Sequence, residues 1–173
     1  MKNLIIISGE ACTGKTTVGR ALATELGWVF QSAGNHVREF AKEKHAMGIH
    51  AFQDLCAVNP EIDRQLDHDF CQKIRERLVE GVGMVVDFRM GAHFFPAAMS
   101  IYLKASPEVV RQRLVVRTGE DFASLSMRNS QSRRRLLEIY GYDYAAEANY
   151  GHVIDTDNMK EAQIVERVIT LRG

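Results

Sequence analysis

The chain has 173 residues, 46% hydrophobic and 25% charged, which suits one globular domain and excludes a disordered or fibrous protein. Its 22 basic and 22 acidic side chains cancel, which argues against a surface that coats nucleic acid or an anionic membrane. Three cysteines without a CxxC pair and six histidines without metal-ligand spacing indicate reduced thiols and no protein-held transition metal. Residues 4–7 are too short an apolar run for a membrane helix or signal peptide, so we expect a cytoplasmic protein. We also expect a monomer with a single domain that spans residues 1–173.

The predicted elements alternate between strands and helices along the chain. Continuous apolar runs predict five strands, at 4–8, 28–31, 84–87, 101–103 and 152–155. Apolar residues at helical spacing and capping residues predict helices over 15–26, from Asn59-Pro60 to Gly81, from Ser106 towards Arg117, and from about Ala162 to the last residues. Strands that alternate with helices and are apolar on both faces predict an α/β fold with a covered parallel sheet.

A glycine-rich phosphate-binding motif follows the first strand. Residues 9–16 read GEACTGKT, with glycine at the first and sixth positions and Lys-Thr after them. In such a loop, backbone N–H groups turn towards phosphate oxygens, and the next helix presents its positive end to the same anion. We predict a nucleotide-binding set made of Gly9, Ala11, Cys12, Thr13, Gly14, Lys15, Thr16 and Thr17. Lys15 is expected to reach the β and γ phosphates, and Thr16 to place its hydroxyl on Mg²⁺.

Polar residues follow the second and third strands. Arg38 lies in the stretch SAGNHVR at 32–38, and Asp87-Phe88-Arg89 ends the third strand. Ligands of parallel sheets bind at the carboxyl ends of the strands. This predicts an acceptor-phosphate site made of Ser32, Gly34, Arg38 and Arg89, although each arginine could instead form a surface ion pair.

Asp87 is a charged residue at the end of an apolar strand, where a carboxylate needs a cation or a hydrogen-bond donor. We predict that it binds Mg²⁺, directly or through water, and takes part in catalysis. The structural alternative is a carboxylate that caps nearby backbone.

Charge is unevenly distributed along the chain. Residues 111–135 hold seven arginines and two acids, and residues 54–69 hold five acids and one base. If 121–140 is helical, Arg128, Ser132 and Arg135 share one face and can close over a triphosphate, although a solvated face is the alternative. Of the arginines at 133–135, at least one must be exposed.

In the acidic segment, Asp63 with Arg64 is our candidate for recognising the exocyclic amine of a base. The alternative is that acidic residues simply favour the N-terminus of a helix.

Taken together, the motifs resemble the nucleoside monophosphate kinases of the P-loop kinase superfamily, and most closely the short, archaeal-type cytidylate kinases. The resemblance runs through 9–16, 32–38, NPEIDRQLD at 59–67, Arg113 with Arg117-Thr118-Gly119, and EIYGYD at 138–143. It implies a three-layer P-loop sandwich with a five-stranded parallel sheet in the order 2-3-1-4-5. It also implies a monophosphate-binding segment at about 34–80 and a helical lid at about 118–140.

The resemblance further implies γ-phosphoryl transfer from ATP with Mg²⁺ to CMP or dCMP. Carried over residue by residue, Arg38 and Arg89 match the acceptor-phosphate arginines, and Lys15 and Thr16 match the donor loop. The lid arginines of the family are matched by Arg117, Arg128 and Arg135.

This chain departs from the family pattern at several positions. Glu10, Ala11 and Cys12 stand where Gly, Pro or Ser is usual, Phe88 replaces a glycine, Leu136 replaces a tyrosine, and Gln131-Ser132 replaces a Ser-Glu pair. These departures concern the identity of the acceptor more than the reaction type. Phe88, His93, Phe94 and Phe95 could wall a reshaped acceptor pocket, although core packing is the favoured interpretation.

Two other functions stay open. The chain could phosphorylate a different small acceptor, such as another nucleotide or a metabolite. It could also be a nucleotide-dependent RNA-binding module, which overall neutrality and the lack of aromatic residues among the clustered arginines make the least favoured.

Overall fold

The computed structural model describes residues 1–115 and 121–173, apart from the side chain of residue 50. Within these residues a five-stranded parallel sheet has the order β2-β3-β1-β4-β5, as the resemblance implies. The strands are β1 (Leu4–Ser8), β2 (Val29–Ser32), β3 (Met84–Asp87), β4 (Met99–Lys104) and β5 (His152–Asp155). Each predicted strand is therefore present, with shifted ends for β2 and β4.

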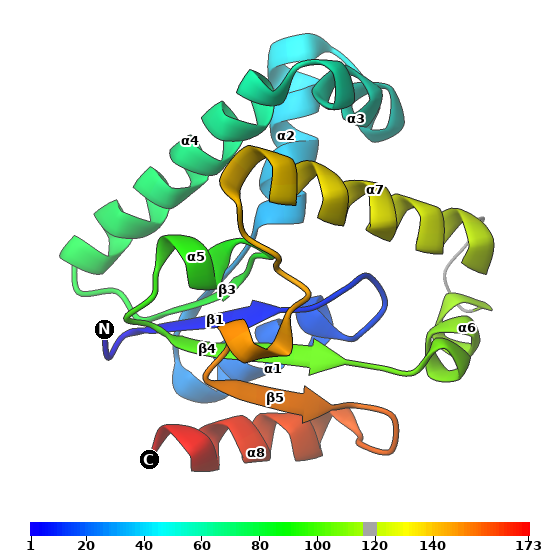
Figure 1. The fold of residues 1–173 in the computed structure, drawn as a ribbon. Helices are drawn as coiled ribbons and strands as arrows, with labels where there is room; N and C mark the ends of the chain where they lie inside the picture. Colours follow the sequence, from blue (N-terminus) through cyan, green and yellow to red (C-terminus); the bar gives the residue numbers. More distant parts are fainter. Residues whose placement is uncertain (116–120) are drawn as a thin grey trace.

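Helices cover both faces of the sheet (Figure 1). On one face lie α1 (Lys15–Leu26) and α8 (Glu161–Arg172), and on the other lie α4 (Pro60–Val79), α5 (Gly91–Phe94) and α7 (Phe122–Tyr140). Ile5 and Ile7 of β1 pack with α1 and α8, whereas Leu4 and Ile6 pack with α4 and α7, because side chains alternate along a strand. The central strands β1 and β3 are fully buried, but the edge strands β2 and β5 are partly exposed.

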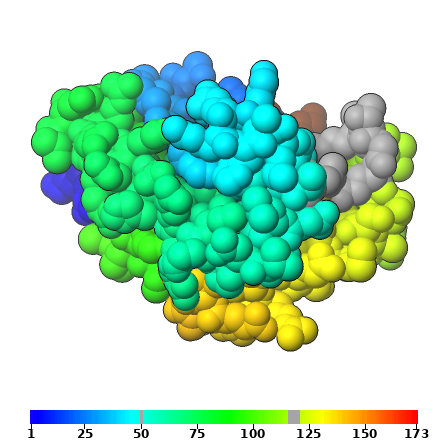
Figure 2. Space-filling view, turned by 90° about the horizontal axis from the view of Figure 1, so that it is seen from above, coloured from blue at the N-terminus to red at the C-terminus, as the bar shows by residue number. Residues whose placement is uncertain are grey.

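A helical segment rises from the carboxyl edge of the sheet between β2 and β3. It consists of α2 (Ala33–His45), α3 (Ile49–Val58) and α4, and it forms the near face in Figure 2. The segment has a small core of its own, built from Ala41, Phe52, Cys56 and Leu66. The side chain of Asn59 caps α4 by accepting from the N–H of Glu61, as predicted.

A long helix, α7, crosses above the same edge of the sheet (Figure 1). Asp121 caps its N-terminus by accepting from the N–H of Ser124 at 2.8 Å, and the helix runs to Tyr140 as expected. The preceding helix, α6 (Pro107–Val115), begins at the predicted proline. Arg117 and the predicted start of the lid at 118 lie outside the described residues.

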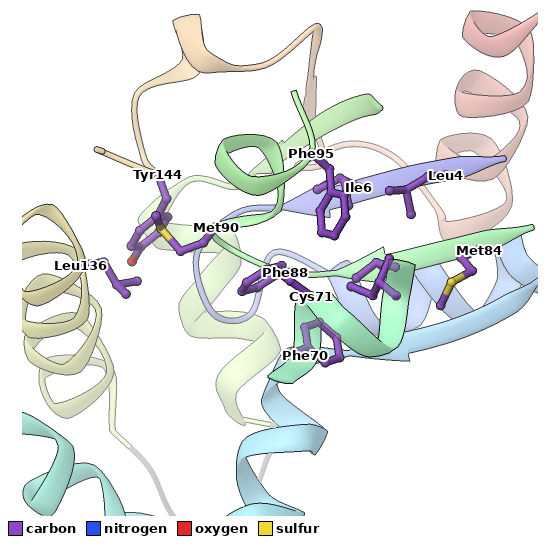
Figure 3. Close-up of a cluster of buried hydrophobic side chains, with 12 residues drawn as sticks. Leu4, Ile6, Phe70, Cys71, Met84, Phe88, Met90, Phe95, Leu136 and Tyr144 are labelled. Atoms are coloured by element: carbon purple, nitrogen blue, oxygen red, sulfur yellow. The ribbon is translucent and has the colours of Figure 1, made fainter. Parts of the chain in front are cut away.

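The C-terminal half of α7 is anchored to the sheet by a buried apolar cluster (Figure 3). Leu136 lies in this cluster with Tyr144 and Met90, and Phe88 packs edge-on against Phe70 with ring centroids 5.2 Å apart. The favoured interpretation of Phe88 as a core residue is therefore the one the structure supports. No helix in the described part of the chain is long and apolar enough to cross a membrane.

Candidate active site

The loop between β1 and α1 owes its shape to backbone constraints. Gly9 has φ 140°, and a Cβ there would lie 2.3 Å from a backbone carbonyl oxygen of β4, so no side chain fits. Gly14 has φ 97° and caps the N-terminus of α1. The Thr13 hydroxyl and the Lys15 ammonium both donate to the carbonyl oxygen of Glu10, at 2.9 and 2.5 Å. These bonds close the loop at a helix N-terminus, where an anion is favoured.

Thr16 and Asp87 meet where α1 begins and β3 ends. The Thr16 hydroxyl donates to Asp87 Oδ2 at 2.8 Å. A hydroxyl and a carboxylate are both hard oxygen ligands of the kind that Mg²⁺ prefers. In residues 1–115 and 121–173, no three His, Cys, Asp or Glu side chains gather into a metal cage. Thr16 and Asp87 would therefore suit a Mg²⁺ ion that takes its other ligands from outside the protein side chains.

A pocket of about 240 Å³ adjoins the phosphate-binding loop and lies between α1, α6 and α8. Gly14, Thr17 and Arg113 contribute to its lining. Arg113 donates to the carbonyl oxygens of Cys12, at 3.3 Å, and Thr156, at 2.8 Å. This arginine thereby ties α6 and the chain after β5 to the phosphate-binding loop.

The two predicted acceptor arginines come from different elements at the carboxyl edge. Arg89, just after β3, donates to Asn129 Oδ1 of α7 at 3.1 Å, and its guanidinium carbon lies 5.2 Å from the centre of the Tyr144 ring. Arg38 of α2 donates to Asn35 Oδ1 at 2.5 Å. Gly34 lies beside Arg38, since a Cβ at Gly34 would be 3.7 Å from Arg38 Nη2. Ser32 ends β2 in register with Asp87, so the predicted acceptor and metal residues share one edge of the sheet.

The arginines of α7 divide between two faces of the helix. Arg128, Ser132 and Arg135 lie on the face that is turned inward, where Ser132 is buried and both arginines are partly buried. Arg133 and Arg134 are exposed and form ion pairs with surface acids. The prediction that the run 133–135 contains exposed arginines is confirmed.

Two polar contacts join α7 to α4. Arg135 Nε lies 3.0 Å from Asp63 Oδ2, and the Tyr140 hydroxyl donates to Asp67 Oδ2 at 2.8 Å. Burial raises the pKa of Asp67 to about 7, and the hydrogen bond from Tyr140 offsets part of this rise. Burial also raises the pKa of Asp63, against the lowering effect of Arg135. Both carboxyl groups are thus poorly solvated and face α7.

Comparisons with known proteins indicate a family for this chain. The family model described as AAA domain matches residues 5–136. A cytidylate kinase from Pyrococcus abyssi is 32% identical over 158 residues, which cover 88% of this chain and 84% of that protein. The chain belongs to the family of P-loop kinases that includes these archaeal cytidylate kinases.

A second relative places a domain like this kinase inside a longer protein. An S-adenosylmethionine-dependent nucleotide dehydratase from Lacinutrix mariniflava is 34% identical over 173 residues, which cover 98% of this chain and 36% of that protein. This chain thus spans about a third of that relative. Among solved structures, a shikimate kinase from Bacteroides thetaiotaomicron superimposes with a TM-score of 0.60 at 19% identity, covering 97% of this chain and 96% of that one. This likeness shows that the fold is that of the P-loop kinases.

Among the described residues, Thr16, Ser32 and Asp87 meet at one edge of the sheet, whereas Arg64 lies apart. Arg64 lies on the exposed face of α4, where it forms an ion pair with Glu61 at 2.9 Å. Its assignment to base recognition stays a prediction, as do the roles of the other site residues.

Sequence reasoning missed Asn129, Asp67 and Tyr140. Their available signal was spacing, since Asp67 stands one helical turn after Asp63, and Asn129 one turn before Ser132. A polar residue on the apolar face of a helix is a candidate ligand or network member, and that signal could have identified Asp67 and Asn129.

Proposed function

We propose that this P-loop kinase transfers the γ-phosphoryl group of ATP to a nucleoside monophosphate, with CMP or dCMP as the preferred acceptor. The observation that carries the proposal is the position of Arg89. Arg89 follows β3 at the same edge of the sheet as the Thr16 and Asp87 pair, and its guanidinium is held there by Asn129 of α7. The names of the relatives support nucleotides as substrates, since one is a cytidylate kinase and another a nucleotide dehydratase.

The donor nucleotide would bind across the loop after β1. Backbone N–H groups of residues 9–15 and the N-terminus of α1 would hold the β and γ phosphates, with Lys15 beside them. The pocket lined by Thr17 and Arg113 adjoins the loop and is where the base and ribose would lie. Mg²⁺, held by Thr16 and by Asp87 directly or through water, would supply positive charge to the β and γ phosphate oxygens.

The acceptor phosphate would bind between Arg38 and Arg89, with Ser32 and Gly34 at the base of this site. Arginine forks form charge-assisted, bidentate bonds with phosphate, which fixes the direction of the attacking oxygen. Because that oxygen is already anionic, no general base is needed to remove a proton. Positioning and charge stabilisation then account for catalysis.

The transfer step forms one bond and breaks another. An oxygen of the acceptor phosphate bonds to the γ-phosphorus, the bond to the bridging β–γ oxygen breaks, and its electron pair leaves with ADP. Lys15 and the inward-facing Arg128 are the side chains assigned to the charge that spreads over the transferred group. Arg117 is the third side chain in this assignment, from the resemblance alone. Closure of α7 over the site would exclude water and suppress hydrolysis of ATP.

The direct test is ADP production from MgATP by the purified protein, with CMP, dCMP, UMP, AMP and no acceptor in parallel reactions. We expect CMP or dCMP to stimulate turnover well above the rate without acceptor. If none of the nucleotides does so while ATP binds, the acceptor assignment is wrong. Shikimate, other small acceptors and RNA are then tried in the same assay.

A further inference from the structure

The side-chain amide of Asn129 uses its oxygen and leaves its nitrogen unused. Asn129 Oδ1 accepts a hydrogen bond from Arg89 Nη2 at 3.1 Å. Because a guanidinium can only donate, the amide presents its oxygen to Arg89 and its NH2 group points elsewhere. That NH2 group has no hydrogen-bond partner among residues 1–115 and 121–173. Asn129 therefore has two N–H donors available for a ligand.

Asn129 also borders the phosphate-binding loop. It lines a cavity of about 190 Å³ whose walls include Glu10 and Thr13 of that loop. The residue is only 6% exposed, so this cavity is where an incoming group can meet its unused donors. The preceding residue on α7 is Arg128, which we assign to the charge of the transferred group. Asn129 thus touches the arginine of the acceptor phosphate and faces the loop of the donor phosphates.

A buried network fixes the position of Asn129. Its backbone carbonyl oxygen accepts from the hydroxyl of Tyr144, a fully buried residue whose ring centre lies 5.2 Å from the guanidinium carbon of Arg89. The Tyr150 hydroxyl in turn donates to the backbone carbonyl oxygen of Tyr144 at 2.6 Å. Donors that are held in place in this way need little reorganisation when charge develops beside them, which makes them effective at a transition state.

We propose that the NH2 group of Asn129 donates a hydrogen bond to an oxygen of the γ-phosphoryl group during its transfer, while Oδ1 keeps Arg89 on the acceptor phosphate. Asn129 is then a catalytic residue that contacts the reacting group and orients the acceptor. The proposal rests on the proposed function and deepens it, since it names a side chain that connects the two substrates. The amide makes and breaks no covalent bond, and it stabilises the charge that spreads over the transferred oxygens.

The variant Asn129→Asp separates the two contacts of the amide. A carboxylate at this position can still accept from Arg89, but it has no N–H to donate to the transferred group. We expect kcat with CMP to fall about 10²- to 10³-fold, the range for removing one preorganised donor. The KM and the calorimetric affinity for CMP should stay close to the wild-type values, because the contact with Arg89 is kept.

Gln131→Glu is the matched control for this variant. It makes the same change from amide to carboxylate on the same helix, two residues further along and at an exposed position. We expect wild-type kcat and KM from this control. A comparable loss of kcat in Gln131→Glu would show that negative charge on α7, and not the lost donor, lowers the rate, and would contradict the proposal.

A second variant, Asn129→Ala, adds no charge and removes both contacts. Its kcat should fall and its KM for CMP should rise. A residue that only orients Arg89 would instead show wild-type kcat in Asn129→Asp and a raised KM alone in Asn129→Ala. Thermal unfolding shows which variants are folded. Wild-type kcat at saturating CMP in either folded variant would overturn the proposal.

Binding of a phosphoryl analogue separates this inference from the proposed function. Calorimetry compares ADP with Mg²⁺ alone and ADP with Mg²⁺ and aluminium fluoride, which replaces the transferred group. If the wild-type protein phosphorylates no nucleotide, the proposed function fails. Tighter ADP binding with aluminium fluoride in the wild type, lost in Asn129→Ala while ADP alone binds as before, would still establish the contact. The same effect of aluminium fluoride in both proteins, including none in either, would refute it.

Discussion

The proposed site has a donor half and an acceptor half, and the two are built in different ways. The phosphate-binding loop is a continuous run of residues whose shape comes from glycine backbone angles and from bonds within the loop, such as that from Lys15 to Glu10. The acceptor half is assembled from side chains that are far apart in sequence, since Arg89 meets Asn129 and Asp67 meets Tyr140. Changes of single side chains should therefore alter which acceptor binds while leaving the donor site intact.

The largest expected effect belongs to the donor half. Lys15→Met removes the cation beside the γ phosphate but keeps most of the apolar stem. We expect kcat to fall about 10²- to 10³-fold with every acceptor, as for the loss of one preorganised donor at a transition state. Steady-state rates with CMP and UMP check this. A loss confined to one acceptor would contradict the division between the two halves.

The next effect should appear in the acceptor half alone. Arg89→Met removes a charge-assisted contact to the acceptor phosphate, worth about 1.5–3 kcal/mol, so kcat/KM for the acceptor should fall about 10- to 150-fold. Binding of ATP, measured by calorimetry in the absence of acceptor, should be unchanged. Arg134→Met is the control, because Arg134 is exposed on the outer face of α7. Weakened ATP binding in Arg89→Met would show that the halves are not separable.

The smallest expected effect concerns stability in the acceptor half. Asp67 has a pKa of about 7 in the folded chain and 3.8 as its ordinary value, so the folded state binds the proton more tightly. Stability from this group is present at low pH and is lost as the pH rises through 7. The unfolding free energy of the wild type should therefore fall by about 2 kcal/mol between pH 5 and pH 8 relative to Asp67→Asn.

Urea unfolding at the two pH values measures this difference, with Tyr140, Asp63 and Arg135 left intact around the group. Parallel curves for the wild type and Asp67→Asn would show that Asp67 titrates near its ordinary value.

The donor half and the sheet were predictable because their signals are local. Apolar runs mark β1 and β3, the spacing of glycines and Lys-Thr marks the phosphate-binding loop, and Asn59 marks the start of α4. Elements with weak local signals were missed. Helix α2 has an apolar face made of Val37, Phe40 and Ala41, but it is short and only His36 and Ala41 of the helix are buried, so the helix was missed.

The acceptor half could be predicted only in part, because its contacts depend on tertiary packing. The sequence marks Asp63 as an acid in a suitable segment, but it pairs that residue with its neighbour Arg64. In the structure Asp63 faces Arg135, which lies 72 positions later in the chain, while Arg64 turns to solvent. Which face of α4 meets α7 is set by the apolar cluster around Leu136, and no local pattern reports it.

The most direct test of the account follows the γ-phosphoryl group itself. ATP labelled in that group is incubated with the protein, Mg²⁺ and CMP, and the products are separated. The account predicts that the label moves to CDP, with little released as inorganic phosphate. Label found only in inorganic phosphate, or unchanged in ATP with CMP present, would contradict a nucleoside monophosphate kinase.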